Sequence, residues 1–346
     1  MKVNRFLSVA LAFSCAFLMF SCHKKEKIAT PELTKEQKEE IRKVEVSIAR
    51  YDEALSSLDL QQLPKGVETL YGQFPENLIA KDSWKNPQMM QGLKAYLQDP
   101  VIKELYKECG KQYQDMSDIQ TALKNALQIY LSHFPNDSIP LFYTLIPGLD
   151  FTTPSVFGYG NDVFICLDMY LGSSYKYYAQ ANMPRYIAAR CERKNIPTDV
   201  FSKCLCYRHL PEKTLVSLLD NMIEEGKKLY FTQTMFPDTP EQDVIGYSPE
   251  KWEWAKKYQG QVWQYFIEKQ LLYAKDETVV RRMIDEAPFT RDFGNESPGR
   301  IGCFIGWQII KSYMANNKDV TLEQLMLNPN SQEILNKSYY KPVFNK

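Results

Sequence analysis

Apolar residues recur at helical spacing along most of the chain, which predicts a mainly α-helical protein. Thr34 and Gln37 have the spacing of a capping box. The apolar positions that follow them predict one amphipathic helix: Ile41, Val44, Ile48, Tyr51 and Leu55. Asp99 followed by Pro100 predicts the start of another helix, because proline fits the first helical position.

Three further helices are predicted by the same signals. Ser117 begins an amphipathic stretch that ends before Pro135. Between residues 214 and 231 the apolar side chains share one side of a helix, so this helix is expected to be largely buried. Ser248 and Pro249 mark the start of the third, whose apolar and aromatic positions predict two packed faces.

Two short segments have the composition of strands. Leu141–Ile146 and Val163–Leu167 are apolar runs rich in β-forming residues, and turn residues lie between them. They predict a small sheet. The expected fold is therefore α+β and predominantly α-helical, with a single α-rich globular domain over residues 34–346.

The start of the sequence has the pattern of an export signal. Two cations precede an apolar run over residues 6–20 that is too short to span a bilayer as a helix, which predicts a signal peptide over residues 1–21. Residues 18–22 resemble a bacterial lipobox, so Cys22 is the expected attachment point for acyl groups such as palmitate. Residues 22–33 would then tether the domain to the membrane. A plain secretory signal with an incidental cysteine is the alternative.

The composition bears on the expected partners and does not restrict the fold. The 346 residues include 42 Lys and Arg against 42 Asp and Glu. Proteins that bind nucleic acid usually present a strongly basic face, so nucleic acid is not an expected partner. Six cysteines follow Cys22, and Cys166 and Cys303 lie in apolar runs where buried free thiols are expected.

The common motifs of catalysis are missing from the sequence. His133 precedes Phe134 and His209 precedes Leu210, so neither histidine begins the HExxH pattern that binds zinc on a helix. The sequence also has no GxSxG, Walker or GxGxxG motif. We therefore predict no catalytic residue, no metal and no cofactor.

The remaining candidates for a site are charged residues beside helices. Glu225 lies next to Gly226 at the edge of the apolar face predicted over residues 214–231, where a carboxylate needs a partner or changes its pKa. Arg300 lies in the first turn of a later helix, where the helix dipole disfavours a cation, so Glu225 or Glu296 is its expected partner. Glu225, Glu296 and Arg300 would form either a structural ion pair or the border of a ligand cleft.

Two glycines in that later helix predict close packing. Gly302 and Gly306 lie four residues apart, so they share one face of the helix. Glycine lowers helix propensity by about 1 kcal/mol relative to alanine, and its presence at both positions indicates that another backbone approaches this face.

Most of the sequence resembles one bacterial family. The matching stretches within residues 221–314 are NMIEEGKKLYF, IGYSPEKWEW, VWQYFIEKQLLY, APF and ESPGRIGCFIGWQIIKSYM, and the run from SPGRIG to GWQI is the most specific. They resemble the GldB-type gliding-motility lipoproteins. The sequence also looks distantly like predicted zinc peptidases in which an HExxH helix is followed by a glutamate-glycine helix. Glu225 and Gly226 match that pair and the histidines do not, so the resemblance implies a degenerate zincin-like domain.

The resemblance implies a lipoprotein of the cell envelope that is associated with gliding motility or its protein-secretion machinery. The sequence lacks the acidic run after Cys22 that often marks export to the outer face, so the expected place is the outer membrane, facing the periplasm. Our leading hypothesis is a non-enzymatic protein, anchored through Cys22, that binds other envelope proteins. A divergent hydrolase with a metal or carboxylate site is the alternative. A third hypothesis, carbohydrate binding, requires Trp252, Trp254 and Trp263 to form an exposed row.

Overall fold

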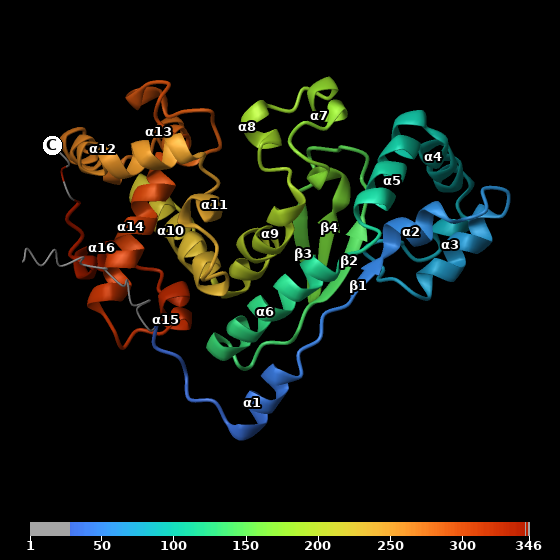
Figure 1. The fold of residues 1–346 in the computed structure, drawn as a ribbon, viewed down its shortest axis with the longest axis horizontal. Coiled ribbons are helices and arrows are strands. Elements are labelled where there is room, and N and C mark those ends of the chain that lie inside the picture. Colours follow the sequence, from blue (N-terminus) through green and yellow to red (C-terminus); the bar gives the residue numbers. More distant parts are fainter. Residues whose placement is uncertain (1–27, 343, 345–346) are drawn as a thin grey trace, which may run out of the picture.

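A computed structural model describes residues 28–342 and residue 344. The predicted signal peptide, Cys22 and the first part of the predicted tether lie outside these residues. Figure 1 shows three parts in a row: the helices of residues 51–112 at one end, a small sheet in the middle, and the helices of residues 218–338 at the other end. The predicted α+β class with a helical majority is confirmed.

The first predicted helix is wrong as a single element. Its residues form α1 (Lys35–Arg42), strand β1 (Ile48–Arg50) and α2 (Tyr51–Ser56). The capping box at Thr34 is present and begins α1. The apolar pattern continues past α1, but β1 pairs in parallel with β2 (Leu141–Leu145), about 95 residues later in the sequence. Local periodicity carries no information on such a distant pairing, which overrides the helical preference of the segment.

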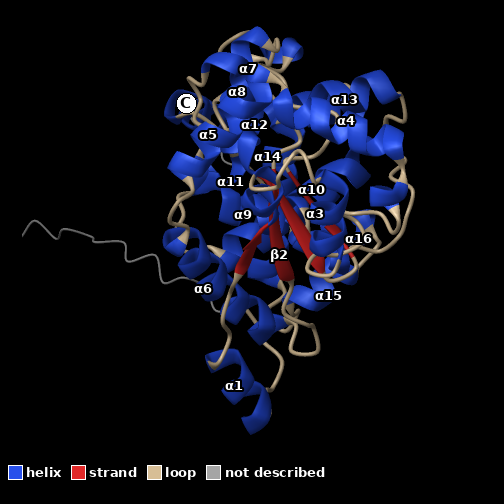
Figure 2. Cartoon of the chain, turned by 90° about the vertical axis from the view of Figure 1, so that its right-hand side faces the viewer, coloured by secondary structure: helices blue, strands red, loops and turns tan. Residues whose placement is uncertain are grey.

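The sheet has four strands in the order β1-β2-β4-β3. β2 (Leu141–Leu145) and β4 (Asp162–Cys166) are the two predicted strands, and they pair in parallel. β3 (Val156–Tyr159) pairs with β4 in an antiparallel hairpin. In Figure 2 the strands lie at the centre of the molecule with helices around them.

Most of the other predicted helix starts are confirmed. Asp99 caps α5 (Pro100–Gln112) through two backbone N–H groups, and α6 (Ser117–His133) ends before Pro135. Ser248 caps α12 (Pro249–Glu268). The helix predicted from residue 214 begins later, as α10 (Leu218–Met235), because Ser217 forms a capping box with Asp220.

The remaining helices connect and cover these elements. They are α3 (Leu63–Tyr71), α4 (Pro87–Gln98), α7 (Lys176–Gln180), α8 (Arg185–Ala188), α9 (Ile196–Lys203), α11 (Glu241–Ile245), α13 (Glu277–Ile284), α14 (Ile301–Asn316), α15 (Leu322–Leu327) and α16 (Ser331–Ser338). Among the residues from 28 onward that the structure describes, no helix has the length and apolar character needed to cross a bilayer.

Helices α10 and α14 pack backbone against backbone, and glycines make this possible. A Cβ added to Gly306 would lie 2.5 Å from the carbonyl carbon of Met222, and one added to Gly226 would lie 2.5 Å from the carbonyl of Gly306. A Cβ on Gly302 would come within 2.9 Å of the Met283 carbonyl oxygen. The close packing predicted from the two glycines of α14 is therefore confirmed, and the backbones of α10 and α13 are its partners.

The main core runs from the sheet through α10 and α14, and a smaller apolar cluster lies under α2 to α4. All six cysteines of the described residues are buried free thiols, as predicted for Cys166 and Cys303. At the start of the described residues, Ala29 forms a parallel bridge with Thr321 and Ile28 packs against the main core. Residues 28 and 29 of the predicted tether are thus in contact with the domain.

Candidate functional site

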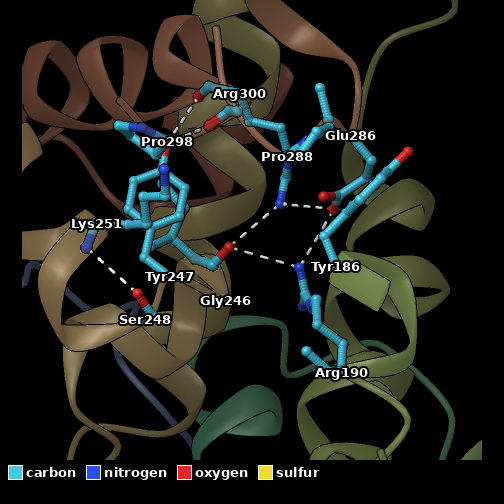
Figure 3. A pocket seen from close by; sticks show the side chains of 14 residues that line it. Tyr186, Arg190, Gly246, Tyr247, Ser248, Lys251, Glu286, Pro288, Pro298 and Arg300 are labelled. Carbon is cyan, nitrogen blue, oxygen red and sulfur yellow. Dashed lines mark hydrogen bonds and ion pairs between the residues drawn. The ribbon is translucent and has the colours of Figure 1, made fainter. Parts of the chain in front are cut away.

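A cavity of about 230 Å³ lies where the part of the molecule that contains the sheet and α6 to α9, the sheet side, meets the part formed by α10 to α16, the helical side. Four segments line it: the end of α8 with the loop after it, the turn between α11 and α12, the loop after α13, and the turn before α14. Figure 3 shows Arg190 and Arg300 approaching the same point from opposite sides, with Glu286 beside them.

Arg300 is the N-cap residue of α14 and has a left-handed backbone conformation, with φ of 55°. Its Nη2 lies 3.4 Å from Oε2 of Glu225, and its Nη1 lies 3.2 Å from Oε1 of Glu286. Nη1 also donates to the carbonyl oxygen of Ile245 at 3.3 Å. Two carboxylates therefore offset the unfavourable position of a cation at a helix N-terminus.

Glu225 projects from α10 towards α14 and contacts two cations. Nζ of Lys228 lies 2.8 Å from its Oε1, and Arg300 holds its second oxygen. Burial would raise the pKa of Glu225, but Lys228 and Arg300 outweigh burial and hold the pKa below its ordinary value. Glu225 is therefore an ionised member of an ion-pair network.

The network continues to the sheet side through Arg190. Its Nη1 lies 3.4 Å from Oε1 of Glu286, and its Nη2 lies 3.8 Å from Oδ1 of Asp199, whose side chain is 3% exposed. Nζ of Lys203 binds the other oxygen of Asp199 at 2.7 Å. Positive and negative groups thus alternate from α9 to α10, in the order Lys203, Asp199, Arg190, Glu286, Arg300, Glu225 and Lys228.

A second cavity, of about 180 Å³, shares Arg190 and Glu286 with the first. Asp199 forms part of its lining and accepts a hydrogen bond from the hydroxyl of Tyr170 at 2.6 Å. Burial acts to raise the pKa of Asp199, while Lys203 and Arg190 hold it below its ordinary value. The arginine-carboxylate pair Arg190 and Glu286 is therefore the boundary between two adjoining cavities.

The structure brings together two of the three residues predicted for the site. Glu225 and Arg300 form an ion pair, whereas Glu296 is exposed and borders a different pocket on α12. The position considered for Glu296 is taken by Glu286, which lies in the loop after α13. No periodic pattern marks this loop residue, and the one available signal is its place directly before Ala287, where the stretch APF begins.

The other candidates from the sequence lie apart from this network. Nε2 of His209 is 3.3 Å from Oδ2 of Asp137, and His133 is buried at the end of α6. Trp252 is buried, and Trp254 and Trp263 are half-buried, so the three rings do not meet the condition for a carbohydrate-binding row. Within residues 28–342 and residue 344, no group of three or more His, Cys, Asp or Glu side chains is placed to hold a metal ion.

The fold and the site define an α-rich α+β protein whose two sides are joined by an ion-pair network around a small cavity. The protein belongs to the family described as gliding motility protein GldB, whose family model matches residues 34–342. The predicted resemblance is therefore confirmed over nearly the whole sequence. It places the protein among lipoproteins associated with gliding motility, a family that is not defined by an enzymatic activity. A search of the curated proteins gave no match, and neither did a search of the solved structures.

Proposed function

We propose that this protein is a non-enzymatic lipoprotein of the cell envelope that serves gliding motility or its secretion machinery by binding another envelope protein at the cavity between Arg190 and Arg300. The observation that carries the proposal is the lining of this cavity, which contains the three cations Arg190, Lys251 and Arg300 and the single carboxylate Glu286. Apolar side chains next to convergent charged groups are typical of a binding site.

The state of Glu225 supports binding over catalysis. A general base or acid works best when its pKa lies near the working pH. Lys228 and Arg300 instead hold the pKa of Glu225 below its ordinary value, further from neutral pH. We interpret α10 and α14 as the remnant of a zincin-like domain in which the glutamate-glycine pair has acquired a structural role. Gly226 allows the contact with α14, and Glu225 fixes Arg300.

The anchor is part of the proposal. Acylated Cys22 would hold the protein on the outer membrane, facing the periplasm, where several acyl groups make release slow. The described residues begin beside Thr321, so the tether between Cys22 and Ala29 would span seven residues, or at most about 25 Å when fully extended.

Site-specific photo-crosslinking in cells tests this function. A photoreactive residue at Tyr186, which lines the cavity, is expected to capture one envelope protein, identified by mass spectrometry. The matched control is the same residue at Tyr159, which is 68% exposed on β3 and not part of the cavity lining. Equal products from both positions, or none from Tyr186, would contradict binding at the cavity.

A metal analysis tests the non-enzymatic role separately. Purified mature protein is expected to contain no stoichiometric zinc and to leave unstructured polypeptides intact. Stoichiometric metal, together with cleavage that Glu225→Gln abolishes, would establish the hydrolase alternative instead.

A further inference from the structure

We infer that the cavity recognises a carboxylate group of its protein partner, and that the side chain of Glu286 occupies the carboxylate position until the partner binds. This inference rests on the function proposed above and adds the chemistry of the recognised group. It concerns the carboxylate of an acidic residue or of a polypeptide's carboxyl end, two sources with the same chemistry.

The geometry around Glu286 is that of a shared and loosely held anion. One oxygen of Glu286, Oε1, pairs with both guanidinium groups, at 3.4 Å from Nη1 of Arg190 and 3.2 Å from Nη1 of Arg300. Well-formed bonds between guanidinium and carboxylate are shorter, about 2.7–2.9 Å, and often use both oxygens. The two arginines therefore retain capacity for a carboxylate that fits better than that of Glu286.

Exposure differs between the cations and the anion. The side chains of Arg190 and Arg300 are 25% and 14% exposed, whereas that of Glu286 is 42% exposed. Each arginine also pairs with a second carboxylate that is less exposed than Glu286: Asp199, 3% exposed, for Arg190, and Glu225, 24% exposed, for Arg300. The most exposed of these three carboxylates is thus the one that contacts both arginines.

Both arginines also contact groups other than Glu286. Each donates from Nη1 to the carbonyl oxygen of Ile245, at 3.5 Å from Arg190 and 3.3 Å from Arg300. The guanidinium of Arg190 lies directly over Gly246, where an added Cβ would come within 2.7 Å of Cζ. These contacts do not depend on Glu286 and restrict both guanidinium groups, which reduces the conformational entropy lost when a carboxylate binds.

Exchange of the carboxylate needs only a side-chain rotation. The residue after Glu286 is held by the turn before α14, because a Cβ on Gly299 would lie 2.9 Å from the carbonyl carbon of Ala287. The backbone next to Glu286 is therefore fixed, while its half-exposed carboxylate is free to turn towards solvent. Its departure would leave three cations in the lining and no carboxylate, which favours an anion.

The volume and walls of the cavity limit the ligand to a small group. Tyr186, Pro288 and Pro298 contribute apolar surface beside the arginines. A volume of about 230 Å³ accommodates a single residue, and not a folded element. The cavity therefore suits the terminal residue or one acidic residue of an extended segment.

Peptide binding to the full mature protein in detergent tests the inference. The probes are three fluorescent peptides of one Gly-Ser-rich sequence: one with an internal Glu and an amidated end, one with Gln and a free carboxyl end, and one with Gln and an amidated end. Fluorescence anisotropy should show that Glu286→Gln tightens binding of at least one carboxylate peptide by about tenfold or more, with no change for the neutral peptide. The peptide that responds identifies the source of the carboxylate.

Two variants serve as controls. Glu241→Gln removes a carboxylate of similar exposure, 40%, that pairs with Lys311 outside the cavity, and it is expected to leave all three affinities unchanged. Arg190→Gln is expected to weaken the responding peptide by about tenfold or more. Thermal melting of each variant checks that the fold is retained, and Glu286→Gln alone decides the outcome if Arg190→Gln does not fold.

Three results would overturn the inference: no binding of any peptide to the Glu286→Gln protein, equal binding of all three peptides, or an equal effect of Glu241→Gln. Competition by inorganic phosphate at lower concentration than glutarate would also overturn it, because the site would then prefer a tetrahedral anion. Failure here with crosslinking retained at Tyr186 would refute the carboxylate and leave the proposed function standing. Carboxylate binding without crosslinking in cells would refute the proposed function instead.

Discussion

Replacement of Gly306 by alanine tests whether the contact between α10 and α14 determines the stability of the helical side. The new Cβ would lie 2.5 Å from the carbonyl carbon of Met222, and closer still to its oxygen. A long side chain could change its rotamer to relieve this overlap, but a backbone carbonyl cannot. The two helices must therefore separate. Overpacking of this kind costs about 1–3 kcal/mol, and occasionally more.

The magnitude follows from two opposing terms. Alanine in place of glycine favours the helix by about 1 kcal/mol. The backbone overlap is severe, so its cost is expected at or above the upper end of the range. We expect Gly306→Ala to lower the free energy of unfolding by about 2 kcal/mol or more, and the melting temperature by several degrees.

Urea unfolding followed by circular dichroism measures this change. Gly92→Ala is the matched control, since Gly92 lies exposed within α4 and an added Cβ meets no atom within 4 Å. That variant should gain about 0.5–1 kcal/mol. A Gly306→Ala protein as stable as the parent, or stabilised like Gly92→Ala, would refute the close packing of α10 on α14.

Three other predictions concern single groups. Burial lowers the pKa of His133 to about 4, so between about pH 6.5 and pH 4 the unfolded protein binds a proton that the folded protein does not, and stability falls with falling pH by up to about 3 kcal/mol. In urea titrations, His133→Leu should reduce this loss relative to the parent, and an unchanged pH dependence would contradict it. Asp99→Ala removes the cap of α5 and should cost about 1 kcal/mol of unfolding free energy, whereas no change would mean that the cap is not formed in solution. Alkylation of a denatured protein that begins at residue 23, without reductant, should label six thiols by mass, and any lower number would indicate a disulfide among Cys109, Cys166, Cys191, Cys204, Cys206 and Cys303.

Local signals account for the elements that the sequence predicted correctly. Asp99, Ser248 and Pro249 satisfy the free N–H groups of a helix start within a few residues, so their meaning is the same in any fold. The spacing of the two glycines in α14 is also a local signal. It predicted that another backbone packs closely on this face, but it did not identify which one. The family stretches extended this information to most of the sequence.

Non-local contacts decided what the sequence did not reveal. Strand β1 forms because Ile48 meets Phe142 of β2, so the apparent helix from Thr34 to Leu55 is divided. Arg300 pairs with Glu286 and not with the predicted Glu296. The reason is that the loop after α13 packs against the turn before α14 and so places the carboxylate of Glu286 next to Arg300.

The sequence by itself determined the helical α+β class, the family and most helix starts, and it offered Glu225 as one of two expected partners of Arg300. Only the tertiary structure decided that Arg190, from the sheet side, faces Arg300 across a cavity with Glu286 between them. The physical reason is that capping and periodicity act over a few residues. An ion-pair network instead depends on which distant segments share a boundary, and that is fixed by the packing of the whole molecule.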